Sequence, residues 1–316
     1  MSIIEKAANK LGVSSPLSSP KRDDRQDVDN DVLVEAAVAR LQKTSAAHDQ
    51  ESRDALDISD ELESQVDAVV TSVSQQVDLA RLKKMGMITP DAEKSQIAEE
   101  FRIIKRPLIA NAFGQGTARV KNGNLIMVTS SLPGEGKTFV AINLAISMAM
   151  EMDRTVLLVD ADVARPRIPE YLGIHADKGL LDVLQDKTLH LPDVLIKTNI
   201  AKLTVLPAGR TYKRATELLA SAAMTDLVED IGNRYHDRII IFDSPPLLAT
   251  SEASVLATHM GQVVMVVEAE KTSQEAVSEA INHHLQSCEV VAMLLNKTTP
   301  SPGTDYYYGY YGSYGK

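Results

Sequence analysis

Tryptophan is absent, cysteine occurs once, and aromatic residues make up only 4% of this sequence of 316 residues. A disulfide needs two cysteines, so the single Cys288 excludes an internal disulfide framework and favours a reducing compartment. No stretch reaches the roughly 18 consecutive apolar residues of a membrane-spanning helix. The charged N-terminal residues also do not match a secretory signal. We therefore expect a cytoplasmic protein that reaches the inner face of the cytoplasmic membrane only through a partner.

Positive charge is also in short supply. The formal net charge is −10, with 33 basic against 43 acidic residues. A general nucleic-acid-binding protein needs a basic surface, so this balance argues against nucleic acid as a partner. Affinity for a polyanion would have to come from one local pocket.

The central stretch Leu125–Thr138 has the sequence LIMVTSSLPGEGKT. An apolar run typical of a buried strand leads through a glycine-containing turn into an apolar-periodic helix. This strand–loop–helix order predicts a phosphate-binding P-loop, although Ser131 stands where the strict pattern has glycine. Lys137 can reach the β- and γ-phosphates, and the Thr138 hydroxyl can bind Mg²⁺. Gly134 allows the backbone a positive φ and a close approach to phosphate oxygens.

Continuous β-branched runs alternate with helical patterns after this loop. Such alternation predicts an α/β fold, a doubly wound and mostly parallel sheet with ligands at the carboxyl ends of the strands. The expected strands are Leu125–Val128, Thr155–Val159, Leu203–Leu206, Arg238–Phe242, Gln262–Val267 and Glu289–Leu295. The expected helices are Val140–Met150, Gly179–Leu184, Thr216–Tyr235 and Thr272–Gln286.

Three regions follow from these patterns. Residues 1–91 form an N-terminal extension, residues 92–298 a P-loop domain, and residues 299–316 a tail. In the extension, Met1–Leu11 has an amphipathic pattern that could dock a partner or a membrane surface, or could equally be a frayed terminus. Ser14–Asp31 has the composition of a disordered linker. Apolar residues at helical spacing from Ile58 to Val77 predict a further helix.

A helix is also expected over Ser95–Ile109. Glu99, Arg102 and Lys105 recur at three-residue steps along it. A solvated charged face is the ordinary interpretation of such a pattern, and a self-association surface is the sharper one.

Acidic residues follow two of the expected strands. Asp160 and Asp162 come after Thr155–Val159, and Asp243 comes after Arg238–Phe242. In P-loop proteins an acidic residue in this position holds Mg²⁺, and a second carboxylate could orient or accept the proton of an acceptor hydroxyl. Arg165 and Arg167 could grip phosphate, contact a neighbouring subunit, or balance the two aspartates as surface cations.

These segments together carry a family resemblance. SSLPGEGKT, VLLVDADVARPR and IIIFDSPP, followed by a tyrosine cluster, resemble the Walker A, A′ and B motifs of bacterial tyrosine kinases. The run EEFRIIK resembles that family's E-x-x-R-x-x-R ring-assembly motif, with Lys105 in place of the second arginine. The N-terminal MSIIEKAANKLG and the EEFRIIKRPL run are similar to the subgroup found in PEP-CTERM/exosortase-linked exopolysaccharide loci.

The resemblance implies an ATP- and Mg²⁺-dependent protein-tyrosine autokinase that regulates exopolysaccharide synthesis and export. It implies catalytic roles for Lys137, Asp160, Asp162 and Asp243, and metal binding by Thr138, Asp160 and Asp243. The nucleotide-binding residues would be Ser131, Pro133, Gly134, Glu135, Gly136, Lys137, Thr138, Phe139 and Asn296. The phosphate acceptors, presented in trans, would be Tyr306, Tyr307, Tyr308, Tyr310, Tyr311 and Tyr314. Asn296 could contact adenine or only cap its strand.

The resemblance also implies partners. These are further copies of the chain in a ring, a membrane-embedded activator of the chain-length-determinant or polysaccharide co-polymerase type, and a tyrosine phosphatase. Two alternatives remain open from the residues. A ParA/MinD-like ATPase switch has a signature lysine early in the loop, where this chain has Leu132, and it has no tyrosine-rich tail. A catalytically silent nucleotide-binding scaffold is the other.

Overall fold

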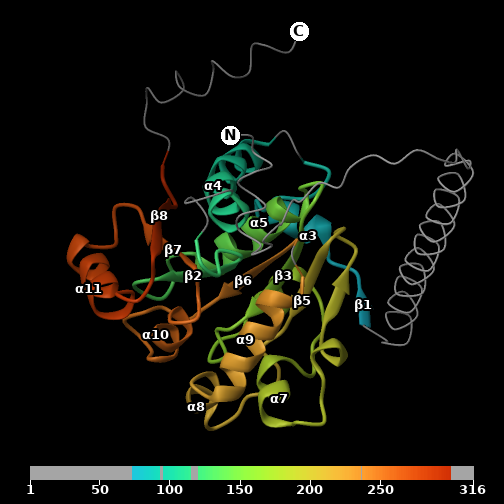
Figure 1. Cartoon of the computed structure of the whole chain (residues 1–316). Coiled ribbons are helices and arrows are strands. Elements are labelled where there is room, and N and C mark those ends of the chain that lie inside the picture. The colour runs from blue at the N-terminus through green and yellow to red at the C-terminus, as the bar shows by residue number, and fades with distance from the viewer. Residues whose placement is uncertain (1–72, 93–94, 115–119, 236, 300–316) are drawn as a thin grey trace, which may run out of the picture. The chain divides into compact units, whose positions relative to one another are not determined.

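A computed structural model describes residues 73–92, 95–114, 120–235 and 237–299 (Figure 1). Their strands join in one eight-stranded sheet of order β1-β4-β5-β3-β6-β2-β7-β8. The strands are β1 (Val73–Gln75), β2 (Leu125–Ser130), β3 (Thr155–Asp160), β4 (Ile196–Thr198), β5 (Leu203–Leu206), β6 (Arg238–Asp243), β7 (Gln262–Glu268) and β8 (Val290–Asn296). All neighbouring strands of this sheet run parallel except β4 and β5. The predicted doubly wound, mostly parallel sheet is confirmed.

Helices cover both faces of the sheet (Figure 1). They are α3 (Leu79–Lys84), α4 (Gln96–Phe113), α5 (Lys137–Ala149), α6 (Ile168–Leu172), α7 (Leu180–Gln185), α8 (Ala215–Leu219), α9 (Ala222–Arg234), α10 (Glu252–Ala257) and α11 (Gln274–His284), with a short 3₁₀ helix at Leu191–Asp193. Side chains of a strand point alternately to the two faces. Accordingly, Ile126 and Val128 pack with α3, α4 and α5, whereas Leu125 and Met127 pack with α7 to α11.

The central strands are fully covered. All six residues of β2 are buried, and β2 lies between β6 and β7. Helix α5 is buried along almost its whole length because it packs directly over the sheet. Burial on both faces explains why these strands are continuous apolar runs in the sequence.

Two expected elements differ from the structure. The helix predicted from Ile58 to Val77 is wrong at its C-terminal end, because Val73–Gln75 is a strand paired with β4. The earlier part of that stretch lies outside the described residues. The helix expected over Thr216–Tyr235 is two helices, since Ser221 caps the start of α9 by accepting a hydrogen bond from Met224 N.

The packed core begins before residue 92, where the sequence analysis places the start of the P-loop domain. Val77, Leu82 and Ile88 are buried in the same cluster as α5. Asn143 of α5 fixes this segment by accepting a hydrogen bond from Ile88 N at 2.7 Å. Helix α3 therefore belongs to the same packed unit as the sheet.

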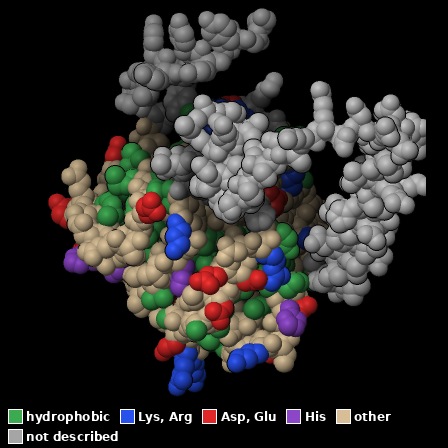
Figure 2. All heavy atoms as spheres, viewed as in Figure 1, with side chains coloured by type: hydrophobic (Ala, Val, Ile, Leu, Met, Phe, Trp, Pro, Cys, Tyr) green, Lys and Arg blue, Asp and Glu red, His purple; other side chains and the backbone are tan. Residues whose placement is uncertain are grey.

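Charged side chains of both signs are interspersed on the described surface visible in Figure 2. No helix among the described residues is both long and apolar enough to cross a membrane.

Candidate functional site

A cleft of about 1000 Å³ lies where the loops leave the carboxyl ends of the strands. Its walls come from the P-loop, the loop after β3, the loop after β6 and the end of β8. The lining residues are Pro133, Gly134, Gly136, Lys137, Thr138, Phe139, Asp162, Ala164, Arg165, Arg167, Tyr171, Pro245, Pro246, Ala249, Thr250, Asn296 and Lys297. Doubly wound sheets bind ligands at this edge, so the position matches the expectation from the fold.

The P-loop links β2 to α5 with two glycines in the left-handed region. Gly134 has φ of 92° and Gly136 has φ of 99°. A Cβ atom on Gly136 would lie 2.2 Å from Nδ2 of Asn296. Backbone conformation and space therefore both require glycine at position 136. Gly136 also stands at the start of α5, where free N–H groups and the helix dipole favour an anion.

Lys137 is paired with Asp162. Its Nζ lies 2.6 Å from Oδ2 of Asp162, and both side chains are largely buried. Burial alone would lower the pKa of Lys137, but the charges of Asp243 and Asp162 outweigh it and raise that pKa. The lysine is therefore a fixed positive charge in the cleft.

Asp160 and Asp243 face each other. They are register partners at the ends of β3 and β6, and both are fully buried. Burial and the charge of Asp243 raise the pKa of Asp160 well above its usual range. Burial likewise raises the pKa of Asp243 to about 6, against the opposing effects of Lys137 and Thr138.

Three carboxylate oxygens of this pair have no hydrogen-bond partner of normal geometry among the described residues: Oδ1 of Asp160 and both oxygens of Asp243. Oδ2 of Asp160 accepts a hydrogen bond from Ile168 N at 3.0 Å. Buried polar atoms are normally satisfied, and each exception needs an explanation such as a ligand or ion.

The donor set fits Mg²⁺ held partly by a substrate. Hard carboxylate and hydroxyl oxygens suit this ion, which usually takes only one or two protein carboxylates beside phosphate and water. No group of three His, Cys, Asp or Glu side chains in the described part forms a complete metal site. The unsatisfied oxygens of Asp160 and Asp243, near the Thr138 hydroxyl, match such a partial ligand set.

The structure places most of the expected nucleotide-binding residues in the wall of the cleft, but Ser131 and Glu135 do not line it. Ser131 is fully buried, and its carbonyl accepts a hydrogen bond from Leu248 N. Glu135 is 2% exposed, and its carboxylate contacts Leu132 N and the Thr272 hydroxyl. The side chain of Glu135 therefore contacts the protein, and a nucleotide contact by this residue stays a prediction that would involve its backbone.

Asp162 and the two arginines lie on the loop after β3. Arg165 N donates to Oδ1 of Asp162 at 3.2 Å, so the loop turns back on the aspartate and aims it at Lys137. Arg165 and Arg167 are exposed and line the cleft. Asn296 lines the cleft as well, and its Nδ2 donates to Glu135 O at 2.8 Å.

Sequence reasoning missed several lining residues. Tyr171, Thr250 and Lys297 carry polar groups into the wall, and Pro245, Pro246 and Ala249 add an apolar part. The Ser-Pro-Pro run after β6 was a visible signal for the prolines. Tyr171 and Thr250 belong to no motif, and only the packing of α6 and of the segment before α10 brings them to the cleft.

Helix α4 separates the three charged residues that were expected to line one face. Glu99 and Arg102 form an ion pair near the surface. Lys105 is buried, with Nζ 2.6 Å from Ser147 O and 2.7 Å from Oε1 of Glu151. Each three-residue step turns about 60° back around a helix of 3.6 residues per turn. Lys105 therefore falls into the buried stripe between Phe101 and Leu108, and the expectation of a solvated face is wrong for it.

Several predicted features lie outside the described residues. They are the N-terminal amphipathic pattern, the linker after it, and all six acceptor tyrosines expected in the tail.

Comparisons with known proteins agree on one family. Residues 123–292 match the model of an AAA domain family. The chain is 31% identical to the tyrosine-protein kinase YwqD of Bacillus subtilis over 72% of this chain and 92% of that protein.

Solved structures give the same result. The chimerical protein CapA2B2 has a TM-score of 0.57 and 26% identity, covering 74% of this chain and 97% of that one. The kinase domain of VpsO has a TM-score of 0.50 and 30% identity, covering 63% of this chain and 98% of that one.

Proposed function

The chain belongs to the AAA domain family and to the bacterial tyrosine-protein kinases, and on this premise we propose how its cleft transfers phosphate. ATP binds along the P-loop with its phosphates at the start of α5. The observation that carries this proposal is that the ion pair of Lys137 and Asp162 lines the cleft, while the buried Asp160 and Asp243 lie close enough for their charges to act on Lys137.

Each residue has a distinct role in the proposal. Lys137 turns from Asp162 toward the phosphates and neutralises charge that develops during transfer. Thr138, Asp160 and Asp243 hold Mg²⁺, which supplies charge stabilisation on the phosphate oxygens when bound. Asp162 loses its lysine partner and can then accept the proton of a phenol; Asp160 is the second candidate for this task.

Tyrosines of the tail are the proposed acceptors: Tyr306, Tyr307, Tyr308, Tyr310, Tyr311 and Tyr314. A phenol has an ordinary pKa of about 10, so a nearby base is needed to favour attack. Pro245, Pro246 and Ala249 line the same cleft as Asp162 and offer an apolar surface for an aromatic ring. Arg165 and Arg167 are positioned to attract phosphate or the acidic Asp305 that precedes the cluster.

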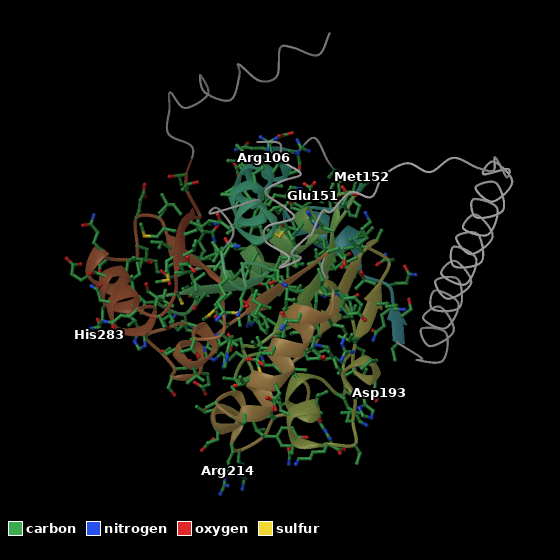
Figure 3. All side chains as sticks on the ribbon, in the orientation of Figure 1. Arg106, Glu151, Met152, Asp193, Arg214 and His283 are labelled. Carbon is green, nitrogen blue, oxygen red and sulfur yellow. The ribbon has the colours of Figure 1, made fainter. Side chains whose placement is uncertain are left out.

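Delivery of the tail in trans requires further copies of the chain. We propose that the exposed part of α4, with Glu99, Arg102 and Ile103, forms the contact between copies. Lys105 supports this helix from inside, through Ser147 and Glu151, while the exposed Arg106 follows Arg102 by one turn (Figure 3).

The proposed biological role is control of exopolysaccharide synthesis and export. Longer relatives support a link to other modules: the chain matches only 26% of the tyrosine-protein kinase wzc of Salmonella typhimurium. We propose a separate membrane-embedded activator of the co-polymerase type, which recruits the kinase to the inner face of the membrane, and a phosphatase that resets the tail.

Phosphosite mapping tests the proposed function. Purified protein incubated with ATP and Mg²⁺ is expected to carry phosphate on tail tyrosines, and Lys137→Met is expected to abolish it. ATP hydrolysis without phosphotyrosine would instead favour a ParA/MinD-like switch, and neither activity would favour a scaffold. The kinase is the stronger proposal, because the relative YwqD is named a tyrosine-protein kinase and the VpsO structure is named a kinase domain.

A further inference from the structure

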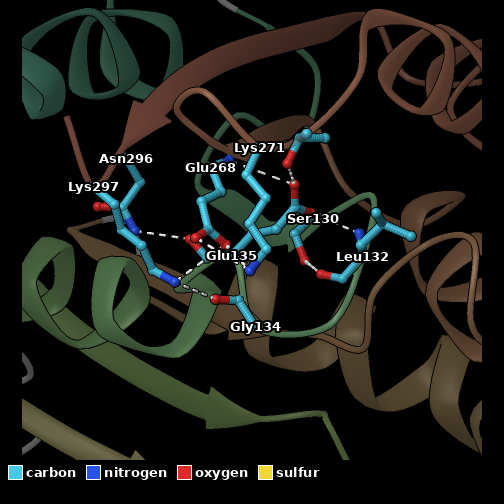
Figure 4. Close-up of polar contacts among 9 residues, drawn as sticks. Ser130, Leu132, Gly134, Glu135, Glu268, Lys271, Asn296 and Lys297 are labelled. Carbon is cyan, nitrogen blue, oxygen red and sulfur yellow. Dashed lines mark hydrogen bonds and ion pairs between the residues drawn. The ribbon is translucent and has the colours of Figure 1, made fainter.

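Glu135 makes an unusual set of contacts for an acidic residue in a phosphate-binding loop. Its Oε2 accepts a hydrogen bond from Leu132 N at 2.6 Å (Figure 4). Its Oε1 accepts one from the Thr272 hydroxyl. Glu268 N points at the same Oε1 from 3.5 Å. The carboxylate is thus bound by its own loop on one side and by the loop between β7 and α11 on the other.

An anion at this position needs a reason. Glu135 lies between the two left-handed glycines of a loop built to bind phosphate, and a buried charge without partners is strongly unfavourable. The carboxylate of Glu135 does have partners, since Leu132 N and the Thr272 hydroxyl donate to it from two separate segments. Hydrogen bonds to an ionised acceptor are roughly twice as strong as neutral ones, which makes Glu135 an effective tie.

The end of β8 holds the same part of the loop by its carbonyl groups. Asn296 Nδ2 donates to Glu135 O at 2.8 Å, and Lys297 Nζ donates to Gly134 O at 2.7 Å (Figure 4). Lys297 also pairs with Glu268 at 3.2 Å. Two consecutive loop residues are therefore fixed from outside the loop, by segments that follow β7 and β8.

We propose that Glu135 is a positioning residue for the nucleotide: with Thr272 it fixes the P-loop conformation that receives the phosphates, without contacting the nucleotide through its side chain. Figure 4 shows how Leu132 is held. The N–H of Leu132 donates to Glu135, and the carbonyl oxygen of Leu132 accepts a hydrogen bond from Ser130 Oγ at 2.8 Å. This inference rests on the proposed function in that the cleft must bind a nucleoside triphosphate.

Binding of a non-hydrolysable ATP analogue with Mg²⁺, measured by calorimetry on the full chain, tests the proposal. Glu135→Ala should weaken binding about tenfold, and Thr272→Val about threefold, as expected for lost hydrogen bonds that order a loop. Glu135→Gln keeps an acceptor for Leu132 and can donate to Thr272, so it should recover binding to within about threefold of wild type. Thr272→Ser should recover binding in the same way.

Coupling between the two residues separates positioning from general damage. The double variant Glu135→Ala/Thr272→Val should bind no more weakly than Glu135→Ala alone, because both changes break one tie. Glu279→Gln, an exposed glutamate on α11, is the matched control and should bind as wild type. Circular dichroism at the assay temperature confirms that each variant is folded.

The outcomes are distinguishable. If wild type does not bind the analogue, the proposed function fails. If wild type binds and Glu135→Ala binds equally well, or if the effects of the two single variants multiply, the tie is overturned while the proposed function stands. Failure of Glu135→Gln to recover any binding would also overturn the tie, because a side chain that can form both hydrogen bonds would then not restore the loop.

Discussion

At the scale of single residues, two buried aspartates form part of the candidate site and lower the stability of the fold. Asp160 and Asp243 are buried opposite each other, and three of their four carboxylate oxygens have no hydrogen-bond partner of normal geometry within the described residues. Burial raises both pKa values, to about 6 for Asp243. Ionised carboxylates here destabilise the folded chain, because the charge of Lys137 offsets their burial only in part.

Replacing Asp243 by asparagine should therefore stabilise the protein in the absence of nucleotide and metal. A carboxyl whose pKa is raised on folding contributes stability below its unfolded pKa of about 4, and that stability is lost as pH rises through about 6. The introduced amide stays neutral at every pH, so Asp243→Asn should gain about 1–3 kcal/mol over wild type at pH 7.5 and almost nothing at pH 4. Thermal unfolding in chelator across this pH range measures the difference.

Asp226→Asn, at an exposed position on α9, serves as the control and should show no such pH-dependent gain. A variant at Asp243 that is less stable than wild type at pH 7.5 would show that the protein itself stabilises the carboxylate.

The positions of the P-loop residues and of the three aspartates were predictable from the sequence. Each of them follows an apolar strand closely, which places it at the carboxyl end of that strand. The carboxylate contacts of Glu135 were not, since Thr272 is distant in sequence and belongs to no motif. Lys105 was misjudged for a related reason: three-residue spacing suggested one face, whereas the helix rotates the third position into the core.

Helix α4 illustrates the scale of whole elements. Its buried stripe runs through Phe101, Lys105 and Leu108, and the lysine reaches the end of α5 to bind Ser147 O and Glu151. The aliphatic stem of Lys105 packs while its ammonium group is satisfied at the rim. The exposed pair of Glu99 and Arg102 lies elsewhere on the helix.

Substitutions on the two parts of α4 should have opposite consequences. Lys105→Ala should lower the free energy of unfolding by about 2–3 kcal/mol, through lost packing and an unsatisfied carbonyl at Ser147. Arg102→Ala should change it by less than about 1 kcal/mol, since exposed ion pairs contribute little. Urea denaturation measures both. Equal effects would mean that Lys105 is not the internal support the contacts indicate.

Long, fully buried elements were predictable and short edge elements were not. The strands β2, β3, β6 and β7 are apolar runs that only a doubly covered sheet explains. By contrast, β1 and β4 have three residues each, and their pairing depends on partners far away in the chain. Propensity carries little information at that length.

At the scale of the whole molecule, the cleft belongs to the described part of the chain, whereas residues 300–316, with the tyrosine cluster, lie outside it. If the tail is only a substrate, a chain ending at Thr298 should bind the ATP analogue as tightly as the full chain and incorporate no phosphate into its own tyrosines. Calorimetry and phosphosite mapping check the two statements. Unchanged phosphate incorporation would place the acceptors elsewhere in the chain.

Phosphorylation should also alter assembly. Each phosphate adds about −1.5 to −2 charges to a tail that must approach an acidic site, so several should repel one another and that site. We expect phosphorylated protein to elute as a smaller species than dephosphorylated protein in size-exclusion chromatography. Identical elution would contradict this.

Lys137 is ion-paired with Asp162 in this structure, so in the proposed mechanism the arriving nucleotide takes the place of Asp162 as the partner of the lysine. While the pair persists, the lysine shields the carboxylate, so no phenol can give up its proton there. A triphosphate that takes Lys137 as its partner exposes Asp162 in the same event. The base is therefore available only when the nucleotide is bound. Solvent water thus meets an uncovered Asp162 only in the loaded state, and the ratio of ATP hydrolysis to tyrosine phosphorylation measures how well the arriving ring excludes it.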